Sequence, residues 1–289
     1  MKQTKPWFTV LDAGILMVLA AAAVFLVRRV GGEMDYRWQW PVILPYLVRS
    51  EGGGWGAGPL MAGFITTLKL SLWAMALATL GGTGLGLLRA GRGRFGRLIA
   101  AGAVETIRNL PPLVLVFIVF FFLGDRITAL IGLEEMVRTA GPGTRAVLEL
   151  LFAPPARLAG FFAGLAALVL YEAAYIAEIV RAGVQSVEQG QWEAAASLGM
   201  TRRQQLRRVV LPQAFRRILP ALAGQLISTI KDSAIVSVIS VPELTFQGLE
   251  LVSATYLSFE VWITIAALYF LLTFACSLGV GHLEKVWRH

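Results

Sequence analysis

The sequence predicts an all-α polytopic membrane protein with about six membrane-spanning helices. Its 289 residues are 56% hydrophobic and only 15% charged, whereas soluble domains carry about 25% charged residues. The mean hydropathy is +0.67. Apolar runs close to twenty residues long recur along the chain. That length crosses a hydrocarbon core about 30 Å thick, so composition and run length predict the same class of fold.

Six segments are predicted to cross the membrane, at residues 10–27, 62–88, 98–123, 157–180, 216–240 and 256–280. The first follows Lys2 and Lys5, as a signal peptide would, but it has no small-residue cleavage site and ends at Arg28 and Arg29. We therefore interpret it as a retained span. The expected organisation is a first span with an outer loop rich in Trp and Gly (1–61), a five-span core (62–283) containing a hairpin (188–212), and a tail (284–289).

Basic residues near the span ends predict the orientation. With the segment 181–217 in the cytoplasm, that face carries 15 basic residues, and the opposite face carries eight basic and seven acidic residues in its first two loops. Six spans place both termini in the cytoplasm. Topology thus accounts for the net charge of +8, and no nucleic-acid partner is needed. Within the second span, Gly82 and Gly86 form a small-xxx-small pair that favours close helix packing.

The segment 188–212 predicts two short helices in the cytoplasm. Gly199 is placed to end the first in a left-handed cap. Thr201 and Gln204 then form a capping-box pattern at the start of the second. Pro212 and Pro220 each remove a helix hydrogen bond and are expected to reset the backbone before the fifth span.

Two interpretations of this hairpin stay open on physical grounds. Basic residues beside an apolar stripe suit a helix lying on anionic headgroups. Alternatively, Ala194, Ala195 and Ala196 beside Gly199 are a weak lipid anchor but let the groove of a soluble partner close over the backbone.

The hairpin resembles the EAA loop of bacterial ABC importer permeases. Their pattern is Glu-Ala-Ala, three residues, Gly, nine residues, and an ending Ile-x-Leu-Pro. Here the matching residues are Glu193, Ala194, Ala195, Gly199, Leu211 and Pro212, with Val209 in place of the isoleucine. The resemblance implies that the hairpin docks on a separate ATPase subunit, which binds ATP and magnesium. It also implies roles of polar anchoring for Glu193, sharp turning for Gly199 and close packing for the alanines.

Three flanking stretches resemble the polar amino-acid permeases of the histidine/glutamine type: "AYIAEIVRAGVQSVEQGQWEAA" (174–195), "ETIRNLPPLVLVF" (105–117) and "KDSAIVSVISVPEL" (231–244). The similarity covers about residues 60–280, and the first span is an extension beyond the usual five-span core. It implies a multi-pass permease of the bacterial cytoplasmic (inner) membrane that imports polar amino acids. A second permease copy, a cytoplasmic ATPase dimer and an extracytoplasmic solute-binding protein would complete the importer.

Charged residues inside spans need a partner or a water-filled path. Glu105 with Arg108, and Glu178 with Arg181, have the i, i+3 spacing of structural ion pairs. Glu172 lies nine residues before Arg181, near mid-membrane. It is a candidate for binding a substrate ammonium, the alternative being a pair with a basic residue of another helix.

Lys231 and Asp232 are expected to mark a helix break near mid-membrane, where transporters often bind solute. A structural pair between spans is the alternative for these two residues.

No G-x-x-x-x-G-K-[ST] segment is present, so this chain lacks the phosphate cradle of an ATPase. Its two histidines and one cysteine predict no metal site. We expect a non-catalytic subunit without a cofactor of its own. The alternatives are an ABC permease for another small solute, an ion-driven transporter using Glu172 and Asp232, and a scaffold whose hairpin binds lipid.

Overall fold

The computed structural model describes residues 13–15, 17–18, 21–22, 24–25, 28–29, 36–51, 54–91 and 93–287. The chain divides into two units, residues 1–44 and residues 45–289. The predicted first span (10–27) belongs to the first unit, and half of its residues lie outside those that the structure describes. Near the end of that unit, the ring of Trp38 stacks on that of Trp40, with centroids 5.7 Å apart.

The described residues of the second unit are mostly helical and include one β-hairpin. Strand β1 (Val48–Glu51) pairs antiparallel with β2 (Gly54–Ala57), with Val48 opposite Ala57. The long helices are α3 (Pro59–Ala90), α4 (Arg94–Asn109), α9 (Leu158–Gln185), α12 (Leu211–Asp232) and α14 (Ser258–Trp287). The shorter helical elements are η1 (Trp40–Val42), α2 (Leu44–Leu47), α5 (Pro112–Ile118), η2 (Val119–Leu123), α6 (Gly124–Leu130), α7 (Leu133–Thr139), α8 (Pro142–Leu151), η3 (Pro155–Arg157), α10 (Gln189–Ser197), α11 (Arg202–Gln204), η4 (Gln205–Val210), η5 (Ser233–Ile239) and α13 (Leu244–Thr255).

Within the described residues, five helical segments are long and apolar enough to cross a membrane. They run Pro59–Ala90, Pro112–Leu130, Pro155–Gln185, Arg202–Ile239 and Ser258–His282. These segments agree with the predicted five-span core except at two places.

The first difference is the predicted span 98–123, which the structure divides. Helix α4 ends at Asn109, and α5 begins at Pro112. Pro111 and Pro112 lack the N–H groups that would continue the α4 hydrogen-bond ladder, so the helix cannot run through them. Val104 of α4 packs against Leu85 of α3 and against Ala174 and Ala177 of α9, and the separate apolar segment is Pro112–Leu130.

The second difference is at the predicted fifth span, which begins earlier than residue 216. A continuous helical segment starts at Arg202, passes through the π-helical turn η4, and reaches Ile239. The prediction that Pro212 and Pro220 reset the backbone was wrong. Both prolines lie inside this continuous helical segment, which accommodates the hydrogen bond that each of them removes.

Helices α3 and α9 form the centre of the bundle, and two glycines set their separation. A Cβ atom on Gly82 would lie 2.7 Å from the carbonyl oxygen of Ala173, and one on Gly86 would lie 2.6 Å from that of Ala177. Both contacts are closer than a methyl group tolerates. The predicted close packing at this small-residue pair is confirmed.

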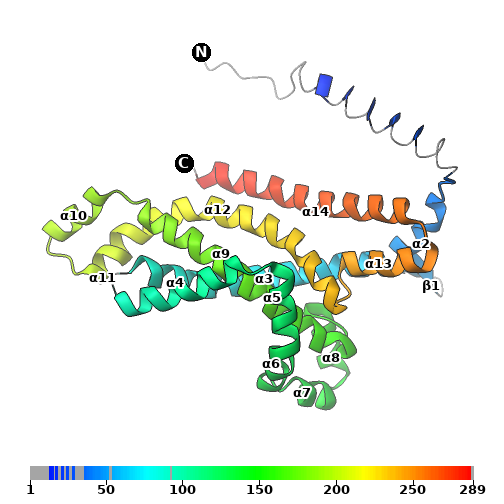
Figure 1. Ribbon diagram of the computed structural model, residues 1–289, viewed down its shortest axis with the longest axis horizontal. Coiled ribbons are helices and arrows are strands. Elements are labelled where there is room, and N and C mark those ends of the chain that lie inside the picture. Colours follow the sequence, from blue (N-terminus) through cyan, green and yellow to red (C-terminus); the bar gives the residue numbers. More distant parts are fainter. Residues whose placement is uncertain are drawn as a thin grey trace. The chain divides into compact units, whose positions relative to one another are not determined.

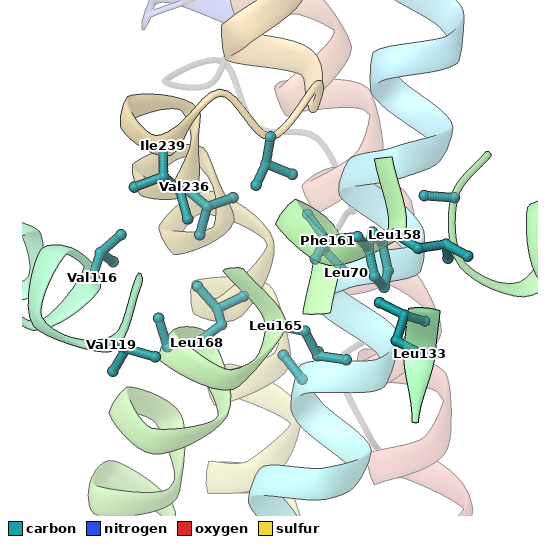
Figure 2. Packing of buried hydrophobic residues seen from close by; sticks show 14 of the residues in the cluster. Leu70, Val116, Val119, Leu133, Leu158, Phe161, Leu165, Leu168, Val236 and Ile239 are labelled. Carbon is teal, nitrogen blue, oxygen red and sulfur yellow. The ribbon is translucent and has the colours of Figure 1, made fainter. Parts of the chain in front are cut away.

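The largest hydrophobic cluster gathers residues from α3, α5, α9 and η5. Figure 2 shows Phe161, Leu165 and Leu168 of α9 lying among Leu70 of α3, Val116 of α5 and Val236 of η5. All of these side chains are buried. The cluster joins η5 to α5.

Figure 1 shows α9, α12 and α14 running lengthwise through the second unit, with α10 and α11 at one end and α13 with β1 at the other. Helices α6, α7 and α8 project to one side. The helical hairpin 188–212 and helix α13 therefore lie at opposite ends of the helical bundle. This is the arrangement expected if they lie on opposite faces of a membrane.

Candidate functional site

The turn of the hairpin is built by Gly199. Its φ of 73° lies in the left-handed region. Its N–H donates to the carbonyl of Ala196 (2.9 Å), and the N–H of Met200 donates to that of Ala195 (3.2 Å). These two bonds form a Schellman motif, which ends α10 by satisfying its last carbonyls. The predicted left-handed cap is confirmed.

The second helix starts with the predicted capping box. The side-chain oxygen of Gln204 accepts a hydrogen bond from the backbone N–H of Thr201 at 2.8 Å. Both ends of the turn are thus fixed by local hydrogen bonds, so the sequence alone determines its shape.

Side-chain contacts hold α10 against the start of α12. The guanidinium of Arg202 lies 3.3 Å from the ring centroid of Trp192, within range of a cation–π interaction. The amide of Gln213 donates to the side-chain oxygen of Gln191 at 3.1 Å. Arg217 donates to the backbone carbonyl of Ser186. These contacts join α10 to α12 and to the end of α9.

The hairpin presents a small knob outward. Leu198 is 82% exposed, and Glu193, Ala194 and Ala196 around it are also exposed. Ala195, by contrast, is only 3% exposed because it faces this chain's own core. Of the alanines that the motif singles out, Ala194 lies on the outer surface and Ala195 supports it from beneath.

The end of the motif anchors the hairpin to the bundle. Leu211 is half-buried against the cluster formed by Val210, Ala214 and Ile218, and Pro212 is exposed in the first turn of α12. The motif residues thus divide into an outward knob around Glu193 and Ala194, a turn at Gly199, and an anchor at Leu211.

A second feature is a cavity of about 170 Å³ near the middle of the bundle. Lys231 and Asp232 line it from the last residues of α12, and Tyr171 lines it from α9. The other lining residues are Pro112, Val116, Ala167, Leu168 and Ile235. At Asp232 the helix changes from α to the 3₁₀ geometry of η5, but the helical segment continues to Ile239, so the expected helix break is wrong.

Glu172 follows the cavity-lining Tyr171 in α9 and is fully buried. One of its carboxylate oxygens accepts a hydrogen bond from the side-chain amide of Gln225 at 2.7 Å. The other has no hydrogen-bond partner among the residues that the structure describes. Its observed partner is thus a neutral amide of α12 rather than a basic residue.

Comparison with known proteins identifies the kind of protein that carries these features. Residues 82–289 match the family described as "Binding-protein-dependent transport system inner membrane component". The chain belongs to this family. It is 35% identical over 225 residues to the probable glutamine ABC transporter permease GlnM of Bacillus subtilis, covering 78% of this chain and 91% of the relative. It is 33% identical over 235 residues to the glutamine transport permease GlnP of Escherichia coli K12, covering 80% and 94%.

The fold of this permease also matches a solved structure, the crystal structure of an amino acid ABC transporter with histidines. The TM-score is 0.62 at 36% sequence identity, over 78% of this permease and 93% of the solved chain. The permease fold inferred from the sequence is therefore confirmed.

Ion pairs at the hairpin end of this permease centre on Glu178. Its carboxylate contacts Arg181, three residues on, and Arg89 of α3 at 3.0 Å. The predicted pair of Glu178 with Arg181 is thus present. Glu105 pairs with Arg89 at 2.8 Å, whereas Arg108, the predicted partner of Glu105, lies 3.9 Å from Glu178. The i, i+3 spacing predicted the wrong partner for Glu105, because α3 places Arg89 between α4 and α9.

At the opposite end of the permease, sequence reasoning missed a buried polar cluster. Glu243 is fully buried, and its carboxylate accepts the backbone N–H groups of Thr245 (2.9 Å) and Phe246 (2.7 Å). It also accepts hydroxyl hydrogen bonds from Tyr269 (2.9 Å) and Thr67 (3.3 Å). Burial raises the pKa of Glu243, while these four donors act in the opposite direction. Glu243 caps α13 and joins it to α3 and α14.

Two further residues were missed near the cavity, Gln225 and Tyr171. The hydroxyl of Tyr171 donates to that of Tyr175 at 3.3 Å. The sequence did offer a signal for Gln225, namely an amide side chain within an apolar span. It offered no such signal for Tyr171, because aromatic residues are common in any span.

Proposed function

We propose that this permease is the membrane-spanning subunit of an ATP-driven importer for polar amino acids, with glutamine-like solutes as the first class to test. A dimer of ABC ATPase subunits, which binds ATP and Mg²⁺, docks on its cytoplasmic hairpin. A solute-binding protein delivers substrate from the opposite face, and a second permease copy completes the pore. The chain lies in the bacterial inner membrane with both termini in the cytoplasm.

The single observation that carries this proposal is the hairpin knob. Leu198 at its tip is 82% exposed, and the Schellman turn at Gly199 fixes its shape. A leucine held out on a rigid turn is suited to a preformed groove of a soluble partner, where its burial would contribute about 1.5–3 kcal/mol. The contacts of Trp192 with Arg202 and of Gln191 with Gln213 would carry the motion of that partner into α12.

The substrate path in this proposal passes the cavity lined by Lys231, Asp232 and Tyr171. An ammonium and a carboxylate there offer complementary charges to both ends of a zwitterion. Glu172, next to Tyr171 in α9, has a carboxylate oxygen that no described residue satisfies. The relatives' glutamine names and this donor set together support a polar amino acid as the solute.

The test is substrate-stimulated ATP hydrolysis and uptake by the reconstituted importer. Gly199→Val puts a β-branched residue at a φ of 73° and is expected to lower both activities at least tenfold. Gly199→Asp places a charge at the same turn and serves as a second variant. The matched control is Gly190→Ala, since a Cβ on Gly190 in α10 meets nothing within 4 Å.

The outcomes separate the alternatives. Full activity in both Gly199 variants would show that the hairpin does not couple ATP hydrolysis to transport. Uptake by the chain alone under a proton or sodium gradient, without ATP, would instead identify a secondary transporter.

A further inference from the structure

A basic surface lies beside the knob and is not used by the coupling proposal. Arg203, Arg207 and Arg208, with Gln204, line a surface hollow of about 470 Å³. All three arginines are exposed. Among the described residues, none of the observed ion pairs involves these three guanidinium groups. We call these three arginines the basic platform.

The platform lies too far along its helix to reach lipid headgroups. The segment Arg202–Ile239 has 38 residues, and at 1.5 Å per residue it is about 57 Å long. A hydrocarbon core of about 30 Å takes up roughly twenty of these residues. Counted back from Ile239, the core ends near residue 220, and the headgroup layer takes in Arg216 and Arg217. The basic platform then lies about 10–20 Å farther into the cytoplasm.

The platform is continuous with the knob and fixed to it. Arg202, next to Arg203, lies over the ring of Trp192 in α10. Gln205, beside the platform, donates its side-chain amide to the carbonyl of Met200 at 2.8 Å, next to the turn. A soluble partner whose groove encloses Leu198 would therefore bring its own surface over the three arginines.

We infer that the basic platform binds an acidic surface patch on the ATPase subunit, adjacent to the groove that receives the knob. This inference rests on the proposed function, because it names the chemistry of the partner's surface. Exposed complementary charges act mainly on the rate of encounter and on register, and less on the final affinity. The platform thus steers the ATPase subunit onto the hairpin, and the knob supplies the apolar contact.

The experiment measures the association rate of the ABC ATPase subunit that co-purifies with this permease, using full-length permease in nanodiscs. The test variant carries Arg203→Gln, Arg207→Gln and Arg208→Gln. The control carries Arg94→Gln, Arg97→Gln and Arg216→Gln, which remove the same charge from exposed positions elsewhere. At about 50 mM salt we expect the test variant to associate roughly tenfold more slowly than wild type and the control less than twofold more slowly. Near 500 mM the difference should vanish.

Further variants and lipid compositions distinguish failure of the platform proposal from failure of the coupling proposal. Arg207→Glu alone should slow association about threefold, which guards against a misfolded triple variant. Equal association rates in the test and control triples, with Gly199→Val still uncoupled, would overturn the platform while leaving the coupling proposal in place. Loss of the effect in neutral phosphatidylcholine nanodiscs, with its return in discs containing phosphatidylglycerol, would assign the platform to lipid. If no ABC ATPase subunit co-purifies with the wild-type chain, both proposals are overturned.

Discussion

Gly82 of α3 lies against Ala173 of α9 so closely that a Cβ on the glycine would be 2.7 Å from the alanine carbonyl oxygen. The same methyl group would also be 2.7 Å from Cβ of Ile176. This contact fixes the distance between the two central helices, and it leads to a stability prediction that has a control on the same helix.

Gly82→Ala is expected to lower the free energy of unfolding by about 1–3 kcal/mol, since overpacking forces the two helices apart. Gly84→Ala is the control, because a Cβ on Gly84 meets nothing within 4 Å. It should be neutral or stabilise by about 0.4–1 kcal/mol. Reversible unfolding in mixed detergent, followed by circular dichroism, measures both. Equal stability of the two variants would contradict the close approach.

The ion-pair cluster predicts unequal effects for its two glutamates. Glu178→Gln removes the carboxylate shared by Arg89 and Arg181. The side chain of Arg89, which is only 11% exposed, then has less negative charge beside it. We expect a loss of about 1–2 kcal/mol. Glu105→Gln removes a carboxylate that is 52% exposed, so the loss should stay below about 1 kcal/mol. The same unfolding assay ranks them, and the reverse order would refute Glu178 as the centre.

The buried carboxyl of Glu243 predicts a pH dependence of stability. Burial raises its pKa in the folded state, so the folded protein holds this proton more tightly than the unfolded chain. The contribution of Glu243 to the free energy of unfolding should therefore fall as pH rises from the ordinary glutamate pKa of about 4.3 through the folded-state pKa.

Glu243→Gln removes the titrating group, and the stability profile between about pH 4 and pH 8 should become flatter. Glu250→Gln, an exposed position on the same helix α13, should leave the wild-type slope unchanged. Superimposable profiles for wild type and Glu243→Gln would show that this carboxyl does not titrate differently on folding.

The bond between Glu172 and Gln225 predicts a separation of transport from stability. Glu172→Gln preserves size and an acceptor oxygen for Gln225 but removes a buried charge, so stability should hold or increase. If the carboxylate attracts the substrate ammonium, uptake in proteoliposomes should fall about tenfold, a difference of about 1.4 kcal/mol. Glu135→Gln, at an exposed position on α7, controls for the exchange of a carboxylate for an amide. Wild-type uptake in Glu172→Gln would reduce Glu172 to a structural role.

The sequence by itself determined the features that depend on composition and on neighbours along the chain. Length and apolar character determined the five-span core. Gly199 determined the left-handed turn, and Thr201 with Gln204 determined the cap, because the partners of each bond lie within a few residues. The spacing of the hairpin motif was sufficient to place the chain in its family.

Only the tertiary structure decided which residues meet across helices. The choice of Arg89 over Arg108 as partner of Glu105, the burial of Ala195 and the bond from Gln225 to Glu172 depend on how helices rotate and cross. The break at Pro111 and Pro112, by contrast, has a local cause in the sequence, and the tertiary structure adds only that α4 packs on α3 and α9. Periodicity tells which side of a helix is apolar, but in a membrane lipid and protein are equally apolar. The sequence therefore could not say which apolar side faces a neighbouring helix.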